Sequence, residues 1–201
     1  MEVALATENN AVDGQIIIEL VFMLRKFRVV PWGGAVRLSG GWKGVVRGIP
    51  TLLDLAAAAG VRHAILMIDN DGGQVRRPAH VTTHVQANEA ANDEDGCASC
   101  LLASVVPAVW NAPPYLRCIT VPVQTLETWL LAVTGFAFTN VVPEKNYARR
   151  VLKRDFYGEI WGAGDSARLS HALAALALPG ALQLLRQRPS FSEFESQLAS
   201  W

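Results

Sequence analysis

Several features that would mark a function class are scarce or missing from this sequence. Its 201 residues carry 18 basic and 18 acidic side chains, so the formal net charge is zero and no overall basic field points to nucleic acid. The apolar run closest to a membrane span, Leu173–Leu178, is far shorter than the roughly 18 residues required. The start of the chain lacks a basic segment followed by an apolar one, which predicts that the protein is not secreted. We therefore expect a cytoplasmic protein without membrane contact, in which any binding of nucleic acid comes from a local patch.

Cysteine is also scarce, with three in the chain, which is too few for a disulfide framework. Two of them form Cys97-x2-Cys100, and His80-x3-His84 precedes them with ligand spacings that suit tetrahedral zinc. A zinc clip of these side chains would explain how the long polar segment 74–96 stays ordered. The alternative is that the histidines are solvated and that the cysteines simply begin a buried helix.

What the chain does contain is an alternation of short apolar runs and helical patterns. Such a βαβ series predicts an α/β fold with a mostly parallel sheet flanked by helices. We expect an α/β domain over 1–140, with a polar insertion at 74–100, and a helical C-terminal extension over 141–201. The predicted strands are Val3–Ala6, Phe27–Val30, His63–Ile68 and Leu116–Val121. The predicted helices are Asp13–Lys26, Pro50–Ala59, Leu101–Trp110, Leu169–Leu178, Ala181–Leu185 and a last one opened by a Ser190 and Glu193 capping box.

The central feature is a pair of acids, Asp69 and Asp71, directly after the strand His63–Ile68 and before two glycines. In open α/β sheets, functional groups collect at the carboxyl ends of such strands. Two carboxylates this close repel each other unless a cation lies between them. The alternative is an ordinary surface turn of the Asp-Asn-Asp-Gly type.

Two further acids occupy comparable places. Glu8 follows the strand Val3–Ala6 and precedes a helix, and Glu127 stands near the start of an apolar helix. Glu127 either stabilises that helix through the helix dipole or contributes another acid to the site. We expect all four acids to meet at one edge of the sheet, where they would bind a cation.

Basic residues are concentrated in two places. Lys43 lies in a glycine-rich stretch, 40–44, which we interpret as a loop that could admit a phosphate, although the Walker A spacing is absent and a plain surface loop is the alternative. A predicted basic helix either contacts nucleic-acid phosphates or is a solvated face. Its cations are Arg149, Arg150, Lys153 and Arg154.

The order of these motifs resembles a known family. The resemblance covers nearly the whole chain, and its motifs are Ala6-Thr7-Glu8, the glycine and lysine stretch at 40–44, Ile65–Asp71, Val123–Ala132, Pro143, Lys145 and Ser190–Phe194. Together they resemble TOPRIM-domain proteins of the DUF4276-like and OLD-nuclease-like type. The resemblance implies a TOPRIM-like, Rossmann-like fold.

The resemblance also implies an activity and its residues. Glu8 resembles the family's acid/base or ligand glutamate, Asp69 and Asp71 its metal-binding pair, and Glu127 an additional acid of the same site. The implied protein is a Mg²⁺- or Mn²⁺-dependent nuclease that acts with an ATPase partner in anti-phage defence. Lys43, or a residue of the basic helix, would add positive charge for the transition state.

The chain departs from the family pattern at two positions. Asn9 stands where the family often has glycine after the glutamate, and Val133 stands where an aspartate often follows Leu-Leu-Ala. These departures keep open a second hypothesis, a non-catalytic interaction subunit that docks on an ATPase through the 74–100 insertion. A third hypothesis is a zinc-stabilised protein that binds nucleic acid without hydrolysing it.

Overall fold

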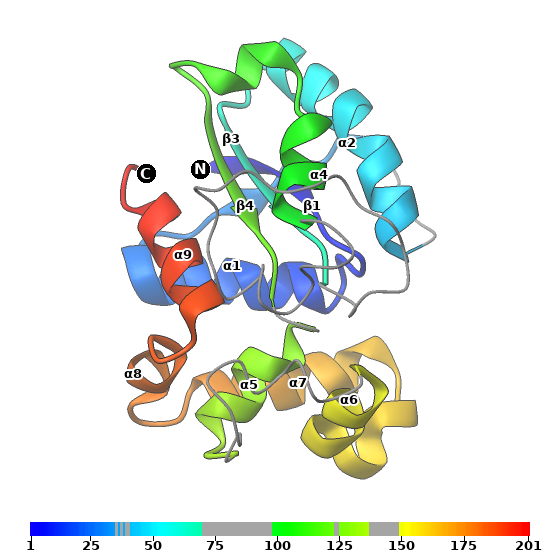
Figure 1. Cartoon of the computed structure of the whole chain (residues 1–201), viewed down its shortest axis with the longest axis vertical. Coiled ribbons are helices and arrows are strands. Elements are labelled where there is room, and N and C mark those ends of the chain that lie inside the picture. The colour runs from blue at the N-terminus through cyan, green and yellow to red at the C-terminus, as the bar shows by residue number, and fades with distance from the viewer. Residues whose placement is uncertain (35, 37, 39–40, 70–97, 123–124, 137–148) are drawn as a thin grey trace.

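The described residues form a four-stranded, entirely parallel sheet (Figure 1). This computed structural model describes residues 1–34, 36, 38, 41–69, 98–122, 125–136 and 149–201. The strands are β1 (Glu2–Ala6), β2 (Val30–Pro31), β3 (His63–Met67) and β4 (Leu116–Thr120), in the order β2-β1-β3-β4. The predicted α/β class with a parallel sheet flanked by helices is therefore confirmed.

The two central strands, β1 and β3, are buried on both faces, as is typical of a parallel sheet. Alternate residues point to opposite sides, so Val3, Leu5 and Ile65 join one hydrophobic core, whereas Ala4 and Leu66 join the other. This two-sided burial explains why the strand before Asp69 is an uninterrupted apolar run.

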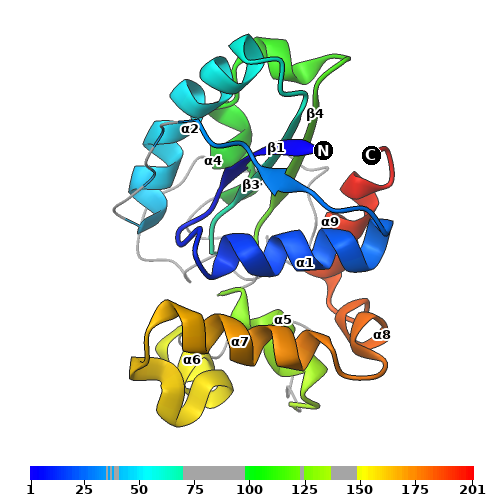
Figure 2. The ribbon, with the colours of Figure 1, turned by 180° about the vertical axis from the view of Figure 1, so that it is seen from behind.

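Helices cover both faces of the sheet. The helices α1 (Asp13–Arg25) and α9 (Pro189–Leu198) pack into the core on one face, and Figure 2 shows α1 lying across it. The helices α2 (Gly41–Ala58) and α4 (Ala98–Ser104) pack into the core on the other. Two short 3-10 helices, Ala108–Asn111 and Gly158–Gly162, are also described.

That second layer of helices lies below the carboxyl edge of the sheet in both ribbon views (Figures 1 and 2). It consists of α5 (Glu127–Val133), α6 (Arg149–Tyr157), α7 (Asp165–Leu176) and α8 (Ala181–Leu185). The helix α7 contacts α1, and α5 contacts α6, α7 and α8. The carboxyl ends of the strands therefore face a helical layer.

The prediction of a glycine-rich loop at 40–44 is wrong for residues 41–44, the part of it that the structure describes. Helix α2 already begins at Gly41 and continues through Pro50, where we had expected it to start. The buried positions Val45 and Ile49 extend the helical spacing upstream of the proline. The burial of these apolar side chains outweighs the low helix propensity of the glycines and the loss of the backbone hydrogen bond that Pro50 cannot donate.

Three other local predictions need correction. The capping box at Ser190 and Glu193 is absent, because α9 begins at Pro189 with Arg188 as its N-cap, and proline suits the first helical position. The helix expected over Leu101–Trp110 ends at Ser104, shortly before Pro107, and the strand expected from Phe27 starts only at Val30.

The edge strand β4 is covered by α9 through a side chain that mimics a neighbouring strand. The Ile119 backbone N–H donates to Gln197 Oε1 at 2.8 Å, and Gln197 Nε2 donates to the Ile119 carbonyl at 2.7 Å. Free strand edges invite pairing with other chains, so this amide protects the edge. None of the helices described here is long and apolar enough to cross a membrane.

Candidate active site

The strand order creates a natural place for a site. The chain runs from β1 to β2 on one side and returns to place β3 on the other side of β1, so the order reverses between β1 and β3. Ligands of open α/β sheets bind in the crevice outside the carboxyl ends of strands at such a switch point. Glu8 follows β1 and Asp69 follows β3. The two predicted acids therefore flank the switch point.

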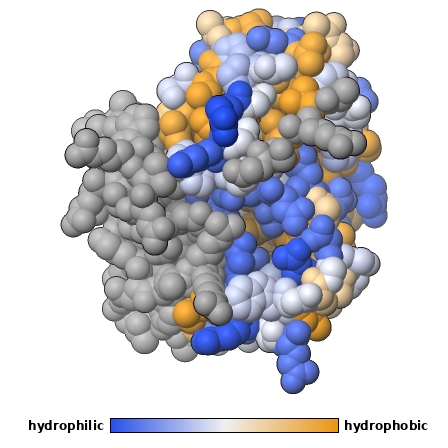
Figure 3. Space-filling view, turned by 90° about the vertical axis from the view of Figure 1, so that its right-hand side faces the viewer, coloured by the Kyte–Doolittle hydropathy of each residue, from blue (hydrophilic) through white to orange (hydrophobic). Residues whose placement is uncertain are grey.

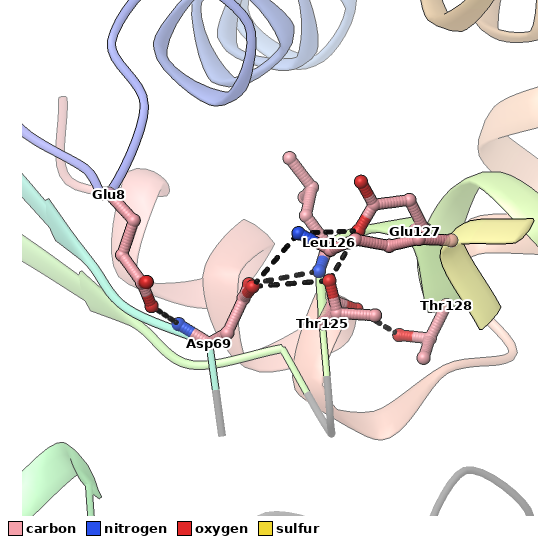
Figure 4. Close-up of polar contacts among 7 residues, drawn as sticks. Glu8, Asp69, Thr125, Leu126, Glu127 and Thr128 are labelled. Carbon is pink, nitrogen blue, oxygen red and sulfur yellow. Dashed lines mark hydrogen bonds and ion pairs between the residues drawn. The ribbon is translucent and has the colours of Figure 1, made fainter. Parts of the chain in front are cut away.

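Glu8 is held there by the backbone of the neighbouring strand end. The Asp69 N–H donates to Glu8 Oε1 at 3.1 Å (Figure 4). Gly41 approaches from α2, and a Cβ placed on it would lie 3.7 Å from Glu8 Oε2. The start of α2, an 18-residue helix, thus lies beside a carboxylate, which its dipole favours.

Asp69 is buried, with 2% of its surface exposed, and both of its carboxylate oxygens accept hydrogen bonds. The Leu126 N–H donates to Oδ1 at 3.1 Å, and the Thr125 hydroxyl lies 3.1 Å from Oδ2 (Figure 4). These bonds fix the segment that precedes α5 against the end of β3. They also bring Glu127, which is distant in sequence, into the same neighbourhood.

Glu127 is the first residue of α5 and is also buried. Its Oε2 lies in close contact with the Thr125 hydroxyl, which therefore stands between the carboxylates of Asp69 and Glu127. A hydroxyl has one proton, so it can satisfy only one of the two at a time. The two carboxylates therefore also need a nearby positive charge.

Lys153 of α6 supplies that charge. Its Nζ lies 3.7 Å from Asp69 Oδ2 and 3.7 Å from Glu127 Oε2, and the side chain is 19% exposed. The Lys153 ammonium thus partly balances the negative charge of the Asp69 and Glu127 carboxylates. Lys153 was expected to face nucleic-acid phosphates; the structure places it on the acids.

Asp13 joins the same acidic group, although the sequence indicated only a helix start. Burial raises its pKa well above the ordinary value, and the nearby carboxylates of Asp69, Glu127 and Glu8 raise it further. Lys153 opposes this shift. Burial and the neighbouring carboxylates therefore favour the protonated form of Asp13.

A cavity of about 260 Å³ opens among these residues, between the sheet edge and the second helical layer. Its charged and hydroxyl-bearing lining comprises Glu8, Asp13, Glu127, Lys153, Tyr157 and Arg168. Figure 3 shows hydrophilic residues gathered across the middle of one face of the molecule, between more apolar regions. Burial, together with Glu127 and Asp13, raises the pKa of Tyr157 above its usual range, so the phenol keeps its proton.

The group suits a hard divalent cation in chemistry and charge. Carboxylate oxygens are the ligands that Mg²⁺ and Mn²⁺ prefer, and the four acids Glu8, Asp13, Asp69 and Glu127 outnumber the nearby cations Lys153 and Arg168. Arg168 is itself paired with Asp165. Within the described residues, however, no three His, Cys, Asp or Glu side chains are drawn around one point. The oxygen donors and the excess negative charge of this group thus suit a divalent cation. The Lys153 ammonium lies between two of the acids, Asp69 and Glu127.

Several predicted site residues lie elsewhere or outside the described residues. Lys43 is exposed, with its Nζ 5.6 Å from the centre of the Trp42 ring, and it does not line the cavity. Arg154 is exposed beside Asp155. Asp71, His80, His84 and Cys97 fall outside the described residues, as do the side chains of Arg149 and Arg150. Of the proposed zinc set only Cys100 is described, half-buried in α4.

Sequence reasoning missed Asp13, Thr125, Tyr157 and Arg168. One signal for Asp13 was present, because it lies three and four residues before the buried Ile16 and Ile17 and so shares their helix face. An acid on the apolar face of a helix needs a reason. No comparable signal marks Arg168, whose place depends on how α7 packs.

The two departures from the family pattern have structural roles here. The Asn9 side chain accepts a hydrogen bond from the Ala11 N–H at 3.0 Å, and its Nδ2 lies 3.3 Å from Asp165 Oδ1 at the start of α7. Val133 is buried in the core at the end of α5. Asn9 therefore links the two layers, and Val133 packs among apolar side chains.

Comparisons with protein-family models, with curated proteins and with solved structures found no match.

Proposed function

We propose that this protein is a TOPRIM-like, Mg²⁺- or Mn²⁺-dependent nuclease that hydrolyses phosphodiester bonds. The observation that carries the proposal is the meeting of Glu8, Asp69 and Glu127, from distant parts of the chain, at the switch point of a parallel sheet. A buried surplus of carboxylates is costly unless protons or cations balance it. Such an arrangement is typical of sites that handle hard cations and phosphates.

Each residue then has a defined task. Glu8, Asp69 and Glu127 would hold the cation, which supplies charge neutralisation on the phosphoryl oxygens and lowers the pKa of a bound water. Thr125 and the Leu126 N–H orient the Asp69 carboxylate. Asp13 retains a proton more readily than an ordinary aspartate, so it suits the role of an acid that protonates the leaving oxygen.

The direct test is a cleavage assay with single-stranded DNA, duplex DNA and RNA in the presence of Mg²⁺ or Mn²⁺. We expect cleavage by the wild-type protein and a loss of about 100-fold or more in Asp69→Asn and Glu127→Gln, as for groups that hold a catalytic metal. Asp54→Asn is the matched control, because Asp54 is an exposed acid on α2. Cleavage that persists in Asp69→Asn would refute the proposal.

The zero net charge of the chain and the family resemblance both favour a protein partner. A chain of zero net charge binds nucleic acid weakly by itself, since affinity depends mainly on phosphate neutralisation. An ATPase partner that presents the nucleic acid would remove this difficulty, in keeping with an anti-phage effector. When the cleavage assay is repeated with the ATPase at the same protein concentration, we therefore expect a higher rate of nucleic-acid cleavage.

A second candidate function is a non-catalytic interaction subunit of an ATPase complex. It is favoured by one observation, the ammonium group of Lys153 lying between Asp69 and Glu127 where a metal would be needed. On this account the acids and Lys153 serve only to join α6 to the sheet. A variant with Glu8, Asp69 and Glu127 all changed to amides would then keep its full biological activity, whereas a nuclease would lose it.

A further inference from the structure

A second cavity, of about 300 Å³, lies at the β4 edge of the sheet. Figure 1 shows β4 running between α4 and α9, and these three elements line the cavity. Their lining residues are Ser99 and Ala103 of α4, Arg117 and Ile119 of β4, and Glu193 and Gln197 of α9. None of these six residues lines the acidic cavity, so the proposed nuclease activity makes no use of them.

Arg117 brings to this cavity a positive charge that no described residue neutralises. Its side chain is half-buried, and its Nη1 is buried with no hydrogen-bond acceptor. Burial lowers the pKa of the guanidinium, whereas a carboxylate in contact with it would raise that pKa. Burying a charge is costly unless an opposite charge pairs with it. Arg117 therefore indicates a place for an anion that comes from outside the chain.

The other polar groups of the cavity select the kind of anion. Glu193 lines the same cavity, and its carboxylate repels further negative charge there. A doubly charged phosphate is therefore disfavoured, whereas a carboxylate carries one charge and matches the planar fork of a guanidinium. Ser99, which is only 7% exposed, adds a hydroxyl that can donate to a carboxylate oxygen.

Glu193 also gives the cavity an acceptor for a positively charged group. A carboxylate has several acceptor positions, so Glu193 can receive an ammonium group besides the interactions that it makes within the chain. The remaining wall is mostly apolar, because Ala103 and Ile119 line it and the Gln197 amide is already bonded to the Ile119 backbone. The volume lies at the lower end of the range for small-molecule sites, which indicates a small ligand.

We propose that this cavity binds a free aliphatic α-amino acid, with its carboxylate on Arg117 and its ammonium group facing Glu193. The aliphatic side chain of the ligand lies against Ala103 and Ile119. Because the charge of a guanidinium is delocalised, a carboxylate on the accessible nitrogens of Arg117 also compensates the buried Nη1. This inference does not depend on the proposed nuclease activity.

The test is thermal unfolding of the full chain with alanine, valine or leucine, and with two analogues of valine. The analogues are 3-methylbutanoate, which lacks the ammonium group, and isobutylamine, which lacks the carboxylate. With each compound at about 10 mM, we expect at least one amino acid to raise the unfolding temperature by about 4 °C or more. We expect each analogue to raise it by less than about 1 °C, because it leaves one charge of the cavity unmatched.

Two variants assign the effect to the cavity. Arg117→Met removes the guanidinium and should abolish the shift, and Glu193→Gln removes the negative charge and should reduce it. Arg154→Met is the matched control, because Arg154 is exposed on α6, and it should keep the full shift. Without ligand, Arg117→Met should unfold at the wild-type temperature or above it, because it removes a charge without a partner.

Four results would overturn the inference. The first is the absence of a shift with all three amino acids, and the second is an equal shift with 3-methylbutanoate, which would show that the ligand needs no ammonium group. The third is a shift that persists in Arg117→Met, which would place the binding site elsewhere. The fourth is a clear drop in the unfolding temperature of ligand-free Arg117→Met, which would show that the guanidinium has a partner within the fold.

Discussion

Lys153 is the single residue on which the electrostatics of the site depend most. It is the nearest described cation to both Asp69 and Glu127, which are almost fully buried. Removing one partner from a buried charge group leaves the others uncompensated, which costs far more than losing an exposed pair. The same ammonium competes with any divalent cation for these carboxylates.

The variant Lys153→Met tests this balance. We expect it to lower the free energy of unfolding by about 2 kcal/mol at pH 8, less than for a fully buried pair because the ammonium is partly exposed. The loss should shrink in millimolar Mg²⁺, because a divalent cation would replace the missing positive charge. Urea unfolding with and without Mg²⁺ measures it, with the exposed Arg154→Met as control. An equal loss in both conditions would show that Lys153 acts only through packing.

Asp13 gives the stability of the protein a pH dependence of defined sign. Its pKa is raised in the folded state by burial and then by the carboxylates around it, so the folded protein binds this proton more tightly than the unfolded chain does. The contribution of Asp13 to stability is therefore most favourable below its ordinary value near 3.8 and is lost as pH rises through the raised pKa.

The variant Asp13→Asn removes this titration while keeping the shape of the side chain. We expect it to be more stable than the wild type at neutral pH, by about 1.4 kcal/mol for each unit by which the folded-state pKa exceeds the ordinary one. The difference should narrow as pH falls towards 4. Urea unfolding over pH 4 to 8 measures both curves, and parallel curves would contradict the assignment.

At the scale of elements, the helix α9 connects the end of the chain to the sheet. Gln197 covers both backbone groups of Ile119 on the edge strand β4. At the N-terminal end of α9, Ser190 accepts a hydrogen bond from Trp129 Nε1 at 2.9 Å, and Phe191 packs edge-on against the same indole with 5.2 Å between the ring centres. One helix thus supports both the sheet and α5, which carries Glu127.

The variant Gln197→Ala should lower the free energy of unfolding by about 1–2 kcal/mol, because it leaves two half-buried backbone groups of Ile119 without partners. Hydrogen exchange of the Ile119 amide should accelerate, while that of amides in β1 should change little. Gln183→Ala on the exposed side of α8 serves as the control. Unchanged protection at Ile119 would show that the edge is covered by other means.

Strong local patterns were sufficient to predict most elements. The uninterrupted apolar run before Asp69 predicts a buried strand, and the alternation of strands and helices predicts a parallel sheet, both as observed. Local rules failed where packing overrides them. The glycines indicated a loop over 40–44, and Pro50 indicated a helix start, yet buried Val45 and Ile49 keep the segment from Gly41 onward in a helix.

At the scale of the whole molecule, sequence reasoning indicated three of the acids that meet, but it missed Asp13 and the residues that the second helical layer brings to them. Glu8, Asp69 and Glu127 follow predicted strands or open predicted helices, so their convergence at one edge follows from parallel topology alone. Lys153, Tyr157 and Arg168 arrive from a helical layer whose docking depends on side-chain packing between layers. No periodicity in a single sequence specifies that docking.

The central claim is that acids from distant parts of the chain act as one catalytic unit. The measurement that tests it most directly is a double-mutant cycle on Mg²⁺-dependent cleavage, with Glu8→Gln, Glu127→Gln and the combined variant. Groups that act together are strongly non-additive, so we predict that each single change removes nearly all cleavage and that the double variant is little worse than either. Losses that multiply in the double variant, or single variants that cleave at the wild-type rate, would contradict the account.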